Sequence, residues 1–155
     1  MFRLSLVLNL ALAGAVATLV YLFVLSGRTG PADDGRIAIL LSPDERDFML
    51  ADMRGLLETV QQASDAIGRN DMTALAAAAR QAGRAGHQEP PFTLLAKLPI
   101  DFKLIGPTMH DGFDQLAAGA GTGLGPQQAT AALAGILSIC AGCHAGYRFD
   151  LETAK

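Results

Sequence analysis

Two cysteines and a histidine stand close together near the C-terminal end of this 155-residue chain. Cys140, Cys143 and His144 form the pattern Cys-x-x-Cys-His. On a helix, residues three and four apart share a face, so both thiols and the imidazole reach the same side. Thioether bonds from the two thiols and an iron bond from the imidazole would hold a porphyrin at three points. The motif therefore predicts one covalent haem c, with His144 as the proximal ligand of its iron.

Three other uses of this cysteine pair compete with haem attachment. A thioredoxin-like dithiol needs the N-terminus of a helix, where the dipole lowers the thiol pKa, but these cysteines are expected near a helix C-terminus. A zinc site would have to recruit His87 and His110 or an acid, without paired spacing. A disulfide across two intervening residues closes too small a loop to stabilise much. Haem attachment is the favoured interpretation.

The N-terminal segment differs in composition from the rest. Residues 4–25 contain no charged side chain and are long enough to cross a bilayer. A cleavable signal peptide has a shorter apolar stretch that ends in small residues, whereas the Ala15-Val16-Ala17 triplet lies in mid-run. We expect residues 1–27 to be an uncleaved signal anchor. The flanking charges leave its orientation open, but covalent haem implies an exported domain, in the periplasm at a bacterial inner membrane.

After the anchor we expect a linker at residues 28–41 and then a helical domain at residues 42–155. Ser42, Pro43 and Glu45 provide an N-cap, a proline at the first helical position and an acid at N3. Further helices are expected at 72–84, at 92–117 with breaks at Pro99 and at Gly106-Pro107, and from 126 to about 147, with a flexible glycine-rich connection before the last. No segment shows sustained strand alternation. The expected fold class is all-α, an antiparallel four-helix bundle preceded by one transmembrane helix.

Charge excludes one class of partner. The formal net charge is −3, the isoelectric point is about 5.5, and Lys and Arg form no cluster. The chain therefore lacks the basic field that attracts phosphate backbones, and nucleic acid is not an expected partner.

A haem motif near the C-terminus of a helical bundle resembles the class II c-type cytochromes, the cytochrome c-prime family. That family usually has an Arg four positions after the haem His, matched by Arg148. Its first helix tends to show an Arg, a distal-pocket residue four later, and an apolar residue or Met three beyond that, matched by Arg46, Leu50 and Met53. The resemblance covers about residues 43–150 and implies a haem pocket formed by these side chains. The membrane anchor departs from the usual soluble form.

The sixth iron position decides what such a protein does. Low-spin members of the family use a Met of the first helix and transfer electrons, whereas high-spin members leave an apolar residue there and bind NO or CO. Alignment on Arg46 places Leu50 at the distal position, while a register shifted by three makes Met53 the ligand, and Met49 lies on the same stripe. We favour Met53. The expected function is electron transfer between redox partner proteins, without catalysis, and NO or CO binding is the alternative.

Two histidines and two arginines are secondary candidates for contact with the haem. His110, beside Asp111, is a further candidate for the distal ligand but is more typical of a solvated helix face, and His87 is expected to be exposed in its loop. The guanidinium groups of Arg46 and Arg148 match the geometry of haem propionates. Pairing of two copies through the first two helices is compatible with the sequence.

Overall fold

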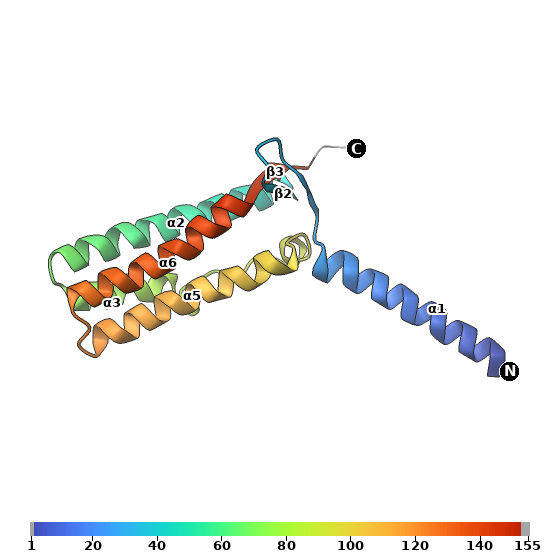
Figure 1. Cartoon of the computed structure of the whole chain (residues 1–155), viewed down its shortest axis with the longest axis horizontal. Helices are drawn as coiled ribbons and strands as arrows, with labels where there is room; N and C mark the ends of the chain where they lie inside the picture. Colours follow the sequence, from blue (N-terminus) through green and yellow to red (C-terminus); the bar gives the residue numbers. More distant parts are fainter. Residues whose placement is uncertain (1, 153–155) are drawn as a thin grey trace.

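The computed structural model describes residues 2–152, most of which are helical (Figure 1). The elements follow in the order α1 (Phe2–Val20), the π-helical η1 (Tyr21–Leu25), β1 (Thr29–Pro31), β2 (Ile37–Leu41), α2 (Pro43–Gly68), α3 (Met72–Ala82), α4 (Phe92–Leu95), α5 (Ile100–Gly121), α6 (Pro126–Gly146) and β3 (Tyr147–Leu151). The predominantly helical fold and the N-terminal apolar helix are confirmed.

Side-chain caps define where α2 and α3 begin. The Ser42 hydroxyl accepts a hydrogen bond from the Glu45 amide (3.3 Å), and the Glu45 carboxylate accepts one from the Ser42 amide (2.8 Å). This reciprocal capping box satisfies two amides that the helix itself leaves unpaired. The Asp71 carboxylate accepts from the Ala74 amide (2.9 Å) at the start of α3. The sequence predicted both helix starts.

Helices α2, α3, α5 and α6 surround the larger of two hydrophobic cores. Helix α3 contacts α2 and α5, and α6 contacts α5 and α2. The small side chains of α3 allow close approach, because Ala76, Ala79 and Ala82 fill little space against α5. The larger side chains of this core come from the neighbouring helices and include Phe113, Leu116, Leu133 and Ile136.

Helix α5 is longer and more regular than the sequence predicts. Pro99 precedes it as its N-cap residue, so the first predicted break is confirmed, but the helix continues through Pro107 to Gly121. The predicted break at Gly106-Pro107 is therefore wrong. Proline disfavours a helical residue before it largely through a clash with the Cβ of that residue, and Gly106 has no Cβ. The flexible connection is also shorter than expected, because Gly119 and Gly121 belong to the helix.

Three short strands form a sheet that the sequence analysis missed. β1 pairs antiparallel with β2, and β2 pairs parallel with β3 in the register Ile37↔Tyr147 to Leu41↔Leu151. Ile39 and Leu41 are fully buried in a second core with Met49, Leu94 and Leu98. The segment 28–41 thus contains two strands rather than the extended linker expected.

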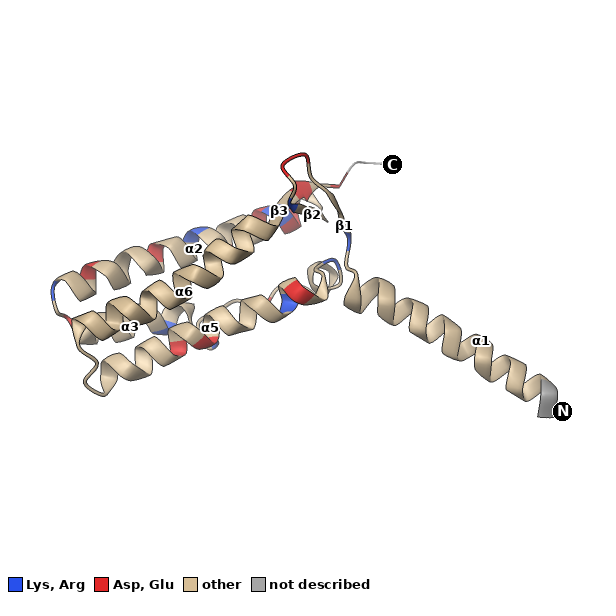
Figure 2. Cartoon of the chain, viewed as in Figure 1, with Lys and Arg blue, Asp and Glu red and all other residues tan. Residues whose placement is uncertain are grey.

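Helix α1 projects away from the rest of the molecule, and its residues from Leu4 onward carry no charge (Figures 1 and 2). Two helices within residues 2–152 are long and apolar enough to cross a membrane, Leu4–Leu25 and Pro126–Gly146. The second of these, α6, buries Leu133 and Ile136 in the larger core. The first packs none of its residues in a core, which is what a segment in contact with lipid requires.

Candidate functional site

The residues of the Cys-x-x-Cys-His motif lie on the wall of a large cavity, here called the motif cavity. Its volume is about 560 Å³, and Cys140, Cys143 and His144 all contribute to its lining. Helices α2, α4, α5 and α6 and the loop before α4 surround it. The lining is predominantly apolar, and α2 alone supplies Phe48, Met49, Leu50, Met53, Leu56, Leu57 and Val60.

Both cysteines are free thiols and partly buried. Burial raises the pKa of the Cys140 thiol and the pKa of the Cys143 thiol, and the neighbouring Cys140 adds to the rise at Cys143. A redox dithiol requires the opposite shift, toward the thiolate. Within residues 2–152, no three His, Cys, Asp or Glu side chains gather as a metal-binding group. The geometry therefore gives no support to the thioredoxin or zinc interpretations.

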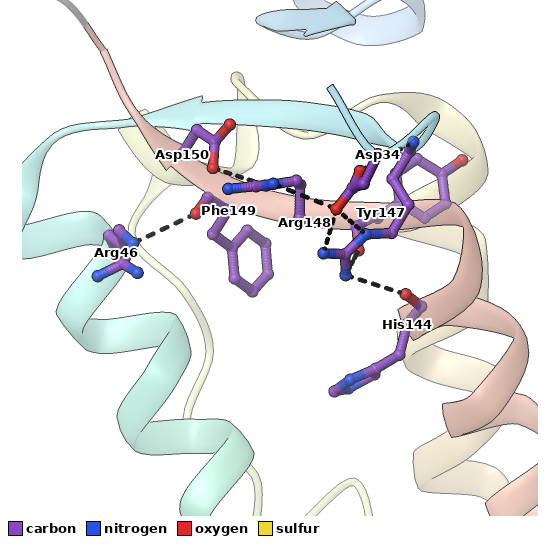
Figure 3. Close-up of polar contacts among 8 residues, drawn as sticks. Asp34, Arg46, His144, Tyr147, Arg148, Phe149 and Asp150 are labelled. Atoms are coloured by element: carbon purple, nitrogen blue, oxygen red, sulfur yellow. Dashed lines mark hydrogen bonds and ion pairs between the residues drawn. The ribbon is translucent and has the colours of Figure 1, made fainter. Parts of the chain in front are cut away.

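His144 lies in the last turn of α6, and its backbone is held from outside the helix. Figure 3 shows the imidazole pointing away from the sheet, and this side chain lines the motif cavity. Arg36 donates to the carbonyl oxygens of His144 (3.2 Å) and Tyr147 (3.3 Å). A cation at this position satisfies carbonyls that the helix leaves unpaired and complements the negative end of its dipole. Arg36 thereby fixes the backbone that carries the imidazole.

Asp34 holds Arg36 in place. Its Oδ2 accepts from Arg36 Nε (3.0 Å) and Nη2 (2.7 Å), a fork that suits a guanidinium. These hydrogen bonds, together with that from the Arg36 amide, lower the pKa of Asp34 to about 2. The sequence analysis missed both residues. The signal available was an acid and a base two apart in a turn, which says nothing of a partner 108 residues away.

Arg46 and Arg148 do not line the motif cavity. Arg46 Nε donates to the Phe149 carbonyl (3.2 Å). Arg148 pairs with Asp150 (2.8 Å) and with Asp34 (3.2 Å), as Figure 3 shows. The structure therefore places neither side chain at the cavity, and their contact with a haem stays a prediction. The physical reason for this placement is the strand β3, which starts directly after α6 and carries the chain and Arg148 onto the sheet.

The residues considered for the distal side of a haem, in contrast to the two arginines, do line the motif cavity. Leu50, Met53 and Met49 all line the motif cavity. Met49 is buried in the second core with Leu94 and Leu98, whereas Met53 only packs against that core and is partly exposed. Both registers considered from the sequence bring a side chain to the cavity, and Met53 is less committed to core packing than Met49.

His110 and His87 lie elsewhere than expected. His110 is only 6% exposed, and its Nδ1 is 2.6 Å from the Ala82 carbonyl oxygen, so the solvated helix face predicted for it is wrong. His87 is also not exposed in its loop, because its side chain is 17% accessible and its ring centroid lies 4.0 Å from that of His110. Asp111, rather than His110, faces outward, where it pairs with Arg84 (2.5 Å).

Comparison with known proteins adds no relative. A scan against protein-family models found no match, and searches of curated proteins and of solved structures found no significantly similar chain. The function is therefore argued from the motif and its geometry.

Proposed function

We propose that this chain is a membrane-anchored c-type cytochrome that carries one covalent haem and transfers single electrons at the periplasmic face of a bacterial inner membrane. In this proposal, α2, α3, α5 and α6 form a four-helix bundle that resembles the cytochrome c-prime family. The observation that carries it is the coincidence of a Cys-x-x-Cys-His motif with a large apolar cavity whose wall includes all three motif side chains.

The cavity meets the requirements of the cofactor. Native interiors contain few voids larger than a water molecule, and sites for cofactors and similar ligands measure about 300–1,000 Å³. The motif cavity, at about 560 Å³, is within that range. Its apolar lining suits a porphyrin face, and both thiols are free to form thioethers. Leu57 and Leu137 line it although they remain substantially exposed, which places apolar contact surface where a planar group would cover it.

Each residue then has a physical task. Haem supplies a one-electron redox centre when bound. Cys140 and Cys143 would prevent its loss, and His144 would provide the proximal nitrogen. The leucines of α2 exclude water, which lowers the local dielectric constant and makes the charge on the centre sensitive to its neighbours. Met53 is the residue of this wall that we favour to complete a low-spin site.

The anchor supports a role at the membrane. Lys103, in α5, donates to the Val24 carbonyl oxygen (3.1 Å) at the end of the apolar segment. The Arg28 amide donates to the Lys97 carbonyl oxygen (2.7 Å). The domain is thus docked against η1 and the residues that follow it, which would hold the redox centre near membrane-bound partners at high effective concentration.

A second function is favoured by one observation. Leu50 lines the same cavity, and Arg46, on which the family register is aligned, lies one helical turn before it. An apolar distal residue leaves the sixth position open to NO or CO. The two functions differ in the side chain that lies nearest the iron.

The test is the full-length protein produced in a host that attaches haem to Cys-x-x-Cys-His proteins and purified in detergent. We expect a mass increase of one haem that survives denaturation, lost when both Cys140 and Cys143 are replaced by Ala. A chain that matures without haem would contradict the proposal.

Spectra of two matched variants identify the distal ligand. With Met53 bound, the ferric spectrum is low-spin with a methionine charge-transfer band near the red edge, and M53L abolishes this band while M49L retains it. A high-spin spectrum and ready CO binding in the unaltered protein would instead favour the gas-binding function.

A further inference from the structure

A pair of histidines separates the motif cavity from a second hollow of different character. The second hollow measures about 330 Å³ and lies between α2, the end of α3 and the loop before α4. His87, His110 and Asp52 line both spaces. The other side chains of the second hollow are mostly polar and exposed, among them Glu58, Gln62, Gln81 and Gln88. One side of the pair is therefore apolar and the other is open to water.

Hydrogen bonding defines the state of His110. A carbonyl oxygen only accepts, so the 2.6 Å contact with Ala82 places a proton on His110 Nδ1. Its Nε2 is then left as the acceptor of the neutral ring. The ring is 6% exposed and is packed against His87 with an interplanar angle of 34°. His110 is thus oriented by its carbonyl partner, as a histidine with a functional second nitrogen usually is.

His87 has the opposite arrangement. Its Nδ1 is buried and has no hydrogen-bond partner, which costs free energy in a packed protein. The nearest acid is Asp52, whose Oδ1 lies 3.7 Å away on α2. A proton added to His87 would therefore face a carboxylate on one side and a neutral imidazole on the other.

The carboxylates around the pair favour one extra proton, and the closeness of the two rings disfavours a second. Asp52 faces it from α2, Glu58 lines the polar hollow, and Glu89 lines the motif cavity. Three cations also line the motif cavity, Arg54, Lys103 and Arg84, and the last of these is neutralised by Asp111 through contacts of 2.5 and 2.7 Å. Two stacked imidazolium rings 4.0 Å apart would repel each other strongly.

We propose that His87 and His110 form a proton-binding site that couples electron transfer in the motif cavity to proton exchange with the polar hollow. The proposal rests on the proposed haem function. When a one-electron donor protein adds negative charge to the cavity, His87 takes one proton from water in the hollow and becomes an imidazolium beside Asp52. When an acceptor protein removes the electron, His87 returns that proton to the hollow. One electron and one proton enter and leave together, and only an N–H bond forms and breaks.

The first test is the reduction potential of the full-length, haem-loaded protein between pH 5 and 8. Full coupling of one proton to one electron lowers the potential by about 59 mV per pH unit. A tenfold difference in proton affinity between the two redox states shifts the potential by about 59 mV in all, so we expect a total fall of that size in the unaltered protein and a flat potential in H87Q. R69Q, which removes a charge at the far end of α2, should keep the slope. A flat potential in the unaltered protein, or an unchanged slope in H87Q, overturns the proposal.

A second measurement needs no variant. The ¹⁵N signals of histidine-labelled protein report proton binding by the His87 ring. We expect this ring to bind its proton about tenfold more tightly in the reduced than in the oxidised protein, a ratio that corresponds to about 59 mV. Equal titration in both states overturns the coupling. Protein that carries haem but shows no coupling refutes this inference alone, whereas protein without haem refutes the proposed function as well.

Discussion

The junction between the anchor and the domain depends on Gly27, and its replacement by Ala should destabilise the domain strongly. Gly27 has φ +63°, a conformation that costs other residues about 1–2 kcal/mol. A Cβ built there would also lie 2.5 Å from the Lys97 carbonyl oxygen and 2.6 Å from backbone atoms of Leu98 and Pro99. Backbone cannot move aside as a flexible side chain can, so the contact must open.

The magnitude follows from what is lost. Opening the junction breaks the hydrogen bond from the Arg28 amide to Lys97, worth about 1 kcal/mol. Together with the strain of the left-handed conformation, we expect G27A to lower the free energy of unfolding by about 2–3 kcal/mol. Steric overlap that relaxation does not relieve would add to this loss.

Two other glycines serve as controls that separate the cost of backbone strain from the cost of the close contact with residues 97–99. Gly35 has φ +84° but open space around it, so G35A should cost only the strain, about 1–2 kcal/mol. Gly30 has neither a positive φ nor a close neighbour, and G30A should be neutral or stabilising by a few tenths of a kcal/mol. The assay is urea unfolding of full-length protein in detergent, followed by circular dichroism. If G27A costs no more than G35A, the close contact with residues 97–99 does not determine the junction.

The remaining predictions concern the caps and the end of α6. S42A should lose about 1 kcal/mol in the same urea assay, because the capping box disappears. Since the pKa of Asp34 is lowered to about 2, its stabilising effect should be complete above its ordinary pKa of 3.8 and disappear as the pH falls toward 2. The melting temperature of D34N should therefore lack that part of the acid decline. In the haem-loaded protein that the proposed function requires, R36Q should weaken the hold of His144 on iron, so that acid displaces the imidazole at a higher pH in ferric spectra. R148Q, which keeps both Arg36 contacts, should not have this effect. Equal shifts in the two variants would assign the effect to loss of charge alone.

The sequence predicted those parts of the fold that depend on local chemistry. The capping residues of α2, the start of α3, the proline before α5 and the position of the Cys-x-x-Cys-His motif are all local signals, and each lies where expected. The sheet was missed because β2 is a five-residue apolar run whose partner, β3, is 110 positions further along the chain. Such a run has no period that separates a strand from part of a helix.

For the candidate site, too, the sequence predicted what depends on local spacing and missed what depends on contacts between distant segments. The motif residues and the methionines of α2 reach one cavity because helical spacing places them there. Arg148 does not line the cavity because the chain turns into β3 after Gly146. His110 was misassigned because the neighbouring Asp111 suggested a polar face. Only tertiary packing reveals that the end of α3 covers the histidine and leaves the aspartate to Arg84.

The small sheet matters more for the proposed function than its size suggests. β2 leads directly into the capping box of α2, β3 follows directly from the turn that carries His144, and β1 follows the Gly27 junction with the anchor. Parallel pairing of β2 with β3 therefore fixes the start of α2 relative to the end of α6, the two helices that would hold the two sides of the haem. Arg36, at the turn between β1 and β2, adds a direct contact to the same helix end. One element thus sets both the spacing across the motif cavity and its position relative to the apolar N-terminal segment. Because electron transfer between proteins requires a defined approach of the redox centre, an exported domain on a flexible linker would need no such sheet. Under the proposed function, the sheet would give the carrier a fixed orientation, so that its partners would approach one side of the molecule.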